Sequence, residues 1–88
     1  MTSFARRAFV CGARGGLGEA LVELLLQREE TEQVYATSRE AASPRLLALS
    51  QRDSRLILLP MDLCREETIA AASRRVREGT ERLDLLIN

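Results

Sequence analysis

A cluster of glycines follows the first apolar run of the chain, residues 8–11. Its members are Gly12, Gly15, Gly16 and Gly18. Helical spacing of apolar residues begins within this cluster, at Leu17. A glycine-rich turn between a strand and a helix lets the backbone approach a pyrophosphate, while the N–H groups of the helix start face its negative charge. The cluster therefore predicts a dinucleotide-binding turn, although glycines also occur at such spacing in tight turns that hold no ligand.

The absence of lysine and histidine excludes several other kinds of site. All 13 basic residues are arginine, and the chain has 2 cysteines, Cys11 and Cys64. A P-loop, which also places glycines before a helix, needs a lysine to reach the phosphates. Zinc sites use histidines or a larger set of cysteines than these two. We therefore predict neither a P-loop nor a metal site.

The composition is typical of a single small folded unit that spans residues 1–88. The chain is 45% hydrophobic, and its 13 acidic residues cancel the 13 arginines. A net charge of zero gives no overall positive field, so we expect neither nucleic acid nor an anionic membrane as a partner. No apolar run approaches the ~20 residues of a membrane-spanning helix. The pair Arg6-Arg7 resembles part of an export signal, but the apolar run after it is too short for one, which favours a cytoplasmic location.

Helical and strand patterns alternate along the rest of the chain. The elements expected after the first strand are a helix at residues 17–28, a strand at 34–38, a short helix from 44, a strand at 56–59, a helix at 66–78 and a strand at 83–87. Ser43 and Pro44 begin the second helix as N-cap and first helical residue, and Gly79 would end the third. This order predicts an α/β fold of the Rossmann type: a doubly wound parallel sheet of strand order 3-2-1-4, truncated after its fourth strand.

The expected helices carry apolar residues for burial against the sheet. In the second helix these are Leu46, Leu47 and Leu49, and in the third they are Ile69, Ala72 and Val76. The strands are apolar almost throughout, as in sheets that are covered on both faces. Tyr35 belongs to the second strand, and we expect it to be a packing residue.

Four motifs in order resemble those of the short-chain dehydrogenase/reductase family. The first is Cys11-Gly12-x-x-x-Gly16-x-Gly18, which resembles the family's TGxxxGxG. The second is Tyr35-Ala36-Thr37-Ser38-Arg39, which is similar to the end of the second strand in NADP-preferring members. The third is Met61-Asp62-Leu63, which is similar to the residues that hold the adenine ring. The fourth, residues 83–88, is similar to LDxLxNNAG up to its first asparagine, Asn88. The residues of these motifs are most similar to those of carbonyl-reductase-like and C-factor-like short members.

The glycines alone do not choose between two branches of that family. Gly12, Gly15 and Gly18 also fit the GxxGxxG spacing of the extended, sugar-nucleotide-epimerase branch. The Asp62-Leu63 pair and the Asn88 ending favour the short branch.

The resemblance implies a nicotinamide dinucleotide cofactor. The turn residues that it implies are Gly12, Ala13, Arg14, Gly15, Gly16, Leu17 and Gly18. Ser38 and Arg39 would meet the 2′-phosphate of NADP(H), because an acid at this position would instead bond the ribose hydroxyl of NAD(H). The nearest acid, Glu40, comes one residue too late, so NADP(H) is favoured over NAD(H). Asp62 and Leu63 would hold the adenine.

Two of these side chains also have a purely structural interpretation. Arg39 could be a solvated surface arginine, and Asp62 could simply favour the dipole of the helix that follows it. Their positions at the ends of two neighbouring strands favour the cofactor roles.

Two cysteines depart from the family's pattern. Cys11 stands where the family usually has a threonine whose hydroxyl helps to fix the turn, and Cys64 stands where a side chain often caps the third helix. Loss of that cap would cost about 1 kcal/mol. The two thiols would lie roughly 10 Å apart, too far for a disulfide, so we expect both to be reduced.

The resemblance implies an oxidoreductase that moves hydride between NADPH and a carbonyl or alcohol substrate. In the family the catalytic serine, tyrosine and lysine follow the fourth strand, so we expect no catalytic residue within these 88 residues. We expect an incomplete, marginally stable chain that is inactive alone, and we leave oligomer formation open for the complete protein. A non-catalytic, redox-sensing nucleotide-binding module and a non-functional fragment are the alternatives, and the substrate is not readable from this part of the sequence.

Overall fold

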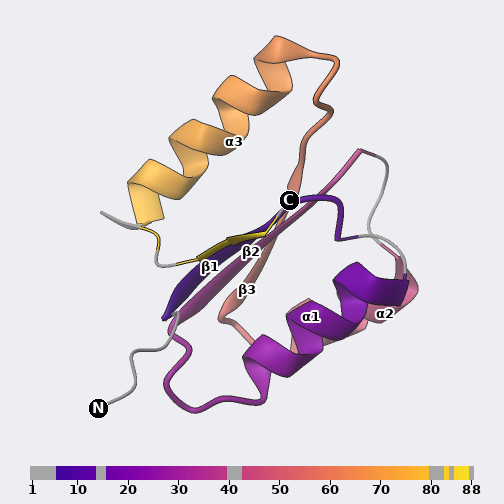
Figure 1. The fold of residues 1–88 in the computed structure, drawn as a ribbon, viewed down its shortest axis with the longest axis vertical. Helices are drawn as coiled ribbons and strands as arrows, with labels where there is room; N and C mark the ends of the chain where they lie inside the picture. The colour runs from indigo at the N-terminus through magenta and orange to yellow at the C-terminus, as the bar shows by residue number, and fades with distance from the viewer. Residues whose placement is uncertain (1–5, 14–15, 40–42, 80–82, 84, 88) are drawn as a thin grey trace.

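The computed structural model describes residues 6–13, 16–39, 43–79, 83 and 85–87, of which the last three are described by their backbone (Figure 1). Strands and helices alternate through this part of the chain, in agreement with the predicted order. They are β1 (Arg7–Val10), α1 (Gly16–Leu26), β2 (Gln33–Ser38), α2 (Pro44–Arg52), β3 (Leu56–Pro60), α3 (Glu66–Gly79) and β4 (Leu85–Ile87).

The four strands form one parallel sheet in the order β3-β2-β1-β4, which confirms the predicted topology. Phe9 of β1 is paired with Tyr35 of β2, and Tyr35 is paired with Ile57 of β3. Helices α1 and α2 cover one face of the sheet and α3 lies on the other (Figure 1). Because all strands run in one direction, the segments that follow β1, β2 and β3 meet at a single edge of the sheet.

The face beneath α1 and α2 holds the larger part of the core. Its buried members are Ala8, Val10, Ala13, Val22, Leu25, Val34, Ala36, Leu46 and Leu56. Alternate residues of each strand contribute to it, because successive side chains of a strand point to opposite faces. The guanidinium of Arg45 on α2 also binds the carboxylate of Glu23 on α1, with Nε 2.8 Å from Oε1.

The second helix begins as predicted and buries less of its surface than predicted. The Ser43 hydroxyl accepts a hydrogen bond from the Leu46 N–H at 3.2 Å, and Pro44 is the first helical residue. Leu46 is buried and Leu49 packs against the core, but Leu47 is 45% exposed. The prediction for Leu47 was wrong because adjacent helical residues point about 100° apart, so only one of the pair faces the sheet.

The third helix contacts the sheet through its C-terminal half. Val76 packs with Phe9 and Tyr35, while Ile69, in the first half of α3, is 37% exposed, contrary to our prediction. Gly79 lies within the helix as its last residue instead of ending it from outside. A side chain at this position would collide with the Tyr35 hydroxyl, so the glycine permits α3 to approach β2 closely. Tyr35 is fully buried, which confirms it as a packing residue.

The remaining element boundaries differ from the predictions by two residues or fewer. Cys11 lies in the turn after β1 instead of within the strand, and α1 runs from Gly16 to Leu26, one residue earlier at its start than predicted. The strand β4 begins at Leu85, two residues later than predicted.

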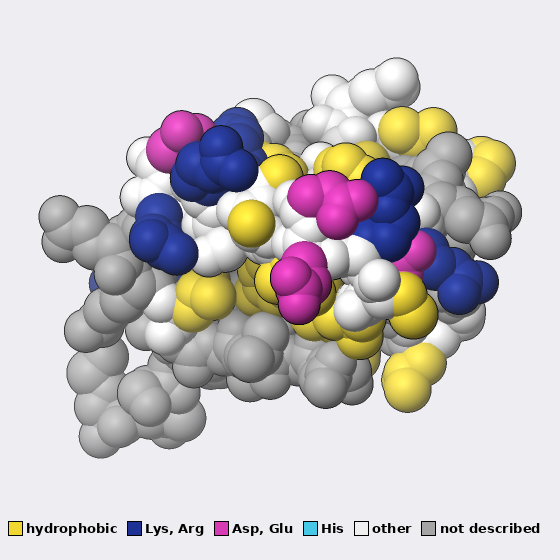
Figure 2. Space-filling model, turned by 90° about the horizontal axis from the view of Figure 1, so that it is seen from above, with side chains coloured by type: hydrophobic (Ala, Val, Ile, Leu, Met, Phe, Trp, Pro, Cys, Tyr) yellow, Lys and Arg dark blue, Asp and Glu magenta, His cyan; other side chains and the backbone are white. Residues whose placement is uncertain are grey.

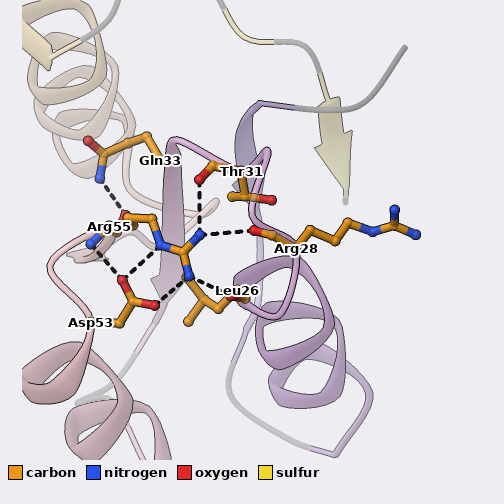
Figure 3. A network of polar contacts seen from close by, with 6 residues as sticks. All are labelled: Leu26, Arg28, Thr31, Gln33, Asp53 and Arg55. Carbon is orange, nitrogen blue, oxygen red and sulfur yellow. Dashed lines mark hydrogen bonds and ion pairs between the residues drawn. The ribbon is translucent and has the colours of Figure 1, made fainter. Parts of the chain in front are cut away.

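Arg55 joins three segments at the edge of the sheet opposite the glycine turn (Figure 3). Its guanidinium binds the Asp53 carboxylate, with Nε–Oδ1 2.9 Å and Nη2–Oδ2 2.7 Å. It also donates to the carbonyls of Arg28 and Thr31, both at 3.0 Å, and to that of Leu26. These carbonyls lie at and beyond the C-terminal end of α1, where the helix leaves its acceptors without internal partners. The sequence analysis did not single out Arg55.

We expect the contribution of this ion pair to stability to depend on pH. The hydrogen bonds from Arg55 hold the pKa of the Asp53 carboxyl below its ordinary value. Its stabilising effect is therefore present above about pH 4, the region of an unfolded aspartate, and is lost as the pH falls through the lowered pKa. Asp53→Asn should lower the free energy of unfolding by about 1 kcal/mol at neutral pH, and the difference should vanish in acid.

Urea unfolding at several pH values measures this effect. Glu30→Gln, at an exposed acid, is the matched control and should show no such pH-dependent difference. A destabilisation by Asp53→Asn that stays constant down to acidic pH would contradict the assignment.

A double-mutant cycle tests the close contact between α3 and β2. Gly79→Ala should destabilise the protein by about 1–3 kcal/mol, because the added methyl group would overlap the hydroxyl of the fully buried Tyr35. Tyr35→Phe should be nearly neutral, since the hydroxyl is buried and has no hydrogen-bond partner among the described residues. The double variant should recover the lost stability, because removal of the hydroxyl removes the collision. Thermal unfolding of the four proteins measures the coupling, and purely additive effects would argue against the contact.

Candidate functional site

The turn after β1 needs glycine at position 12. Gly12 has φ +64°, in the left-handed region that residues with a side chain rarely adopt. Ala13, which follows it, is completely buried. Arg14 and Gly15, two of the predicted site residues, lie outside the described residues. The chain is described again from Gly16, the first residue of α1.

Gly18 lets the start of α1 pack directly on the turn. A Cβ atom at this position would lie 2.7–2.9 Å from backbone atoms of Ala13, which is closer than real contacts allow. The helix start is therefore held against the turn after β1 by a contact between two backbones. Only glycine satisfies this contact without a shift of the main chain.

Gly16 has a different environment from Gly18. A Cβ atom at Gly16 would meet nothing within 4 Å, so packing inside the protein does not explain a glycine here. Leu17 is 78% exposed. The first N–H groups of a helix have no partner within the helix, and the helix dipole makes this end favourable for an anion. The exposed helix start at Gly16 and Leu17 is therefore suited to the approach of a phosphate group.

Thr37 joins this turn to the neighbouring strand. The N–H of Ala13 donates to the Thr37 carbonyl at 2.7 Å, and the N–H of Gly12 donates to the Thr37 hydroxyl at 3.4 Å. Thr37 is 1% exposed and lies immediately before Ser38 and Arg39. The sequence analysis quoted Thr37 only as part of a motif and assigned it no role. A hydroxyl at the end of a central strand, opposite a glycine turn, was the signal available.

Ser38 and Arg39 lie at the end of β2, next to the residue that holds the turn. Ser38 is the last residue of the strand and is 7% exposed, whereas Arg39 is exposed. The Ser38 carbonyl accepts a hydrogen bond from the Met61 N–H at 3.0 Å. The ends of β2 and β3 are therefore connected by the main chain, and the loop after Met61 leads to Asp62.

Asp62 and Thr68 fix the loop between β3 and α3. The Asp62 carboxylate accepts from the Cys64 N–H at 2.9 Å. The Thr68 hydroxyl lies 2.8 Å from both the N–H and the carbonyl of Asp62. We expected the side-chain cap of α3 to be lost because Cys64 stands at the capping position. Asp62 and Thr68 supply polar contacts at the start of α3 instead. Leu63, between them, is 66% exposed.

Charges of both signs are mixed on the face seen from above. In Figure 2, arginine and acidic side chains alternate with apolar and uncharged groups among the described residues of that face. Cys11 is half-buried and Cys64 exposed, and both are free thiols. Within the described ranges, no three or more acidic or cysteine side chains come together as a group that could hold a metal ion. The same part of the chain contains no helix with the length and apolar character needed to span a bilayer.

Comparisons with known proteins agree on one family. The family model described as short chain dehydrogenase matches residues 6–88. The structure of NADPH-bound carbonyl reductase from chicken fatty liver superimposes with a TM-score of 0.84, at 32% sequence identity over 94% of this chain. The putative carbonyl reductase Sniffer of Caenorhabditis elegans superimposes with a TM-score of 0.81, at 29% identity over 94% of this chain.

This chain covers only part of those two proteins. This chain spans 33% of the chicken enzyme and 36% of the nematode protein, about a third of each. A search of curated protein sequences found no significant match.

Two glycines of the turn allow a test that separates folding from ligand access. We expect Gly18→Ala to destabilise the protein by about 2–3 kcal/mol, because its methyl group would overlap the Ala13 backbone. We expect Gly16→Ala to leave stability unchanged or to raise it by up to about 1 kcal/mol, because alanine favours the first helical turn and meets open space. Chemical denaturation of both variants measures the difference. Equal destabilisation would contradict the distinction drawn here between a packed and an open glycine.

Proposed function

This chain belongs to the short-chain dehydrogenase family, and from that membership we propose that it forms the NADP(H)-binding part of a short-chain oxidoreductase. The single observation that carries the proposal is the attachment of the glycine turn to Thr37, the residue before Ser38 and Arg39. A turn suited to phosphate and a cationic side chain thereby lie at the same edge of the sheet, the edge where α/β folds bind their ligands.

The described residues suit a dinucleotide because each part of it has a matching group. We assign the pyrophosphate to the glycine turn, whose residues are Gly12, Ala13, Arg14, Gly15, Gly16, Leu17 and Gly18. The N–H groups of Gly12 and Ala13 are bound to Thr37. Those at the start of α1 would therefore face the phosphate oxygens. Open space at Gly16 and the exposed helix start support this placement. We assign the 2′-phosphate to Ser38 and Arg39, since a guanidinium and a hydroxyl both donate hydrogen bonds to phosphate oxygens.

We assign the adenine to Asp62 and Leu63. Leu63 is exposed in the turn after β3, and the loop that carries both residues is fixed by the hydrogen bonds of Thr68. The bond from the Cys64 N–H to Asp62 orients one carboxylate oxygen within the turn. An apolar side chain and an acceptor would then border the same ring.

The cofactor would supply a hydride to the carbonyl carbon of a small-molecule substrate, or take one from the corresponding alcohol. The residues of this chain would bind the dinucleotide and orient it, and we assign none of them a role in proton transfer. The chicken relative was solved with NADPH bound, which supports this cofactor over NADH. Because the chain spans about a third of either carbonyl reductase, the activity of the whole protein is part of the proposal.

The selectivity for the 2′-phosphate is tested by removing the charge of Arg39. We expect Arg39→Gln to weaken NADPH binding about tenfold or more, and to leave NADH binding nearly unchanged, because only NADPH carries the 2′-phosphate. Arg52→Gln removes an exposed arginine at the C-terminal end of α2 and is the matched control. Titration with each cofactor, followed by its fluorescence, gives the two affinities.

The result distinguishes two failures. Failure of the unaltered protein to bind either cofactor would reject the proposed function. Equal effects of Arg39→Gln on NADPH and NADH would reject the role of Arg39 alone.

A further inference from the structure

We propose that Thr37 is a positioning residue of the nucleotide site, which sets where the glycine turn stands relative to Ser38 and Arg39. The inference rests on the proposed function and adds a residue to it that touches no part of the cofactor. Thr37 would act through the backbone N–H groups that it holds.

The first argument is the position of Thr37 beyond the paired part of the two central strands. The ladder between β1 and β2 ends with the pair Val10 and Ala36. Past that pair β1 turns away, and the contacts from Gly12 and Ala13 to Thr37 take the place of ladder hydrogen bonds. The turn is thus attached to β2 at the one residue that directly precedes Ser38.

The second argument is that the two contacts of Thr37 differ in kind. The bond from Ala13 uses the main-chain carbonyl and would form with any residue at position 37. The bond from Gly12 uses the hydroxyl, so it depends on the residue type. Gly12 is the left-handed residue of the turn, and its backbone has more freedom than that of any residue with a side chain. The hydroxyl therefore restricts the backbone at the left-handed glycine of the turn.

The third argument is that β2 is also held on its other side. Thr37 is paired with Leu59 of β3, and the Ser38 carbonyl accepts from the Met61 N–H. Thr37 cannot shift without disturbing this pairing, so it is a fixed point from which the turn can be positioned. Loss of the hydroxyl alone should leave these main-chain contacts intact and change the turn more than the fold.

The experiment compares T37V, T37S and T31V in the same protein. Valine has nearly the shape of threonine without the hydroxyl, and serine keeps the hydroxyl. Thr31 is the matched control: it is 2% exposed, and its hydroxyl has no hydrogen-bond partner among the described residues. The ligands are NADPH and adenosine 2′-monophosphate, which carries the 2′-phosphate and lacks the pyrophosphate.

We expect T37V to weaken NADPH binding about three- to tenfold and to leave binding of adenosine 2′-monophosphate unchanged. T37S and T31V should bind both ligands like the unaltered protein. Amide hydrogen exchange without ligand gives an independent readout. The Gly12 N–H should exchange about three- to tenfold faster in T37V, while the Ala13 N–H, held by the carbonyl, should not change.

Three results would overturn the proposal. One is unchanged NADPH affinity in T37V, and a second is unchanged exchange of the Gly12 N–H. The third is an equal loss for both ligands together with a lowered Tm, which would give Thr37 a purely structural role. If the unaltered protein binds neither ligand, the proposed function fails and the positioning role fails with it. That outcome is recognised before any variant is made.

Discussion

At its C-terminal end, β2 accepts main-chain hydrogen bonds from the segments that follow both neighbouring strands, β1 and β3. The arrangement of the sheet edge at which the strands end depends on these bonds. On one side the Thr37 carbonyl holds the Ala13 N–H, and on the other the Ser38 carbonyl holds the Met61 N–H. Main-chain groups of a paired strand have directions set by the sheet, not by side-chain rotamers. The glycine turn and the loop before α3 therefore take their positions from the same two adjacent residues.

The helix α1 is fixed at both ends by contacts of different kinds. At its start, the missing side chain of Gly18 allows backbone to touch backbone at Ala13. At its end, the guanidinium of Arg55 binds the carbonyl of Leu26, the last residue of the helix, and Asp53 balances the charge (Figure 3). The ion pair at the opposite edge of the sheet thus helps to hold the same helix whose start borders the glycine turn.

Much of the fold could be predicted because its signals are local. The Ser43-Pro44 pair specifies a helix start within four residues, and its hydrogen bond to Leu46 forms as expected. The alternation of strand and helix patterns gave the strand order, because right-handed parallel crossovers leave few other arrangements. The glycine cluster gave the position of the turn. The prediction for Ile69 was wrong because the sequence does not show how much of an apolar helix face the sheet reaches. The prediction for Leu47 was wrong because adjacent helical residues point in different directions.

By itself, the sequence determined the element order, the parallel sheet, the glycine turn and the family, all of which follow from patterns spanning a few residues or from motifs in a fixed order. Only the tertiary structure decided which residues hold the turn and the helices in place. Thr37 binds a residue 25 positions earlier in the chain, and Arg55 binds a carbonyl 29 positions earlier. Gly79 has no side chain where one would collide with Tyr35 of another element. Such contacts form between elements that meet only after packing. Periodicity and turn chemistry act between near neighbours in the chain, so they do not predict these contacts.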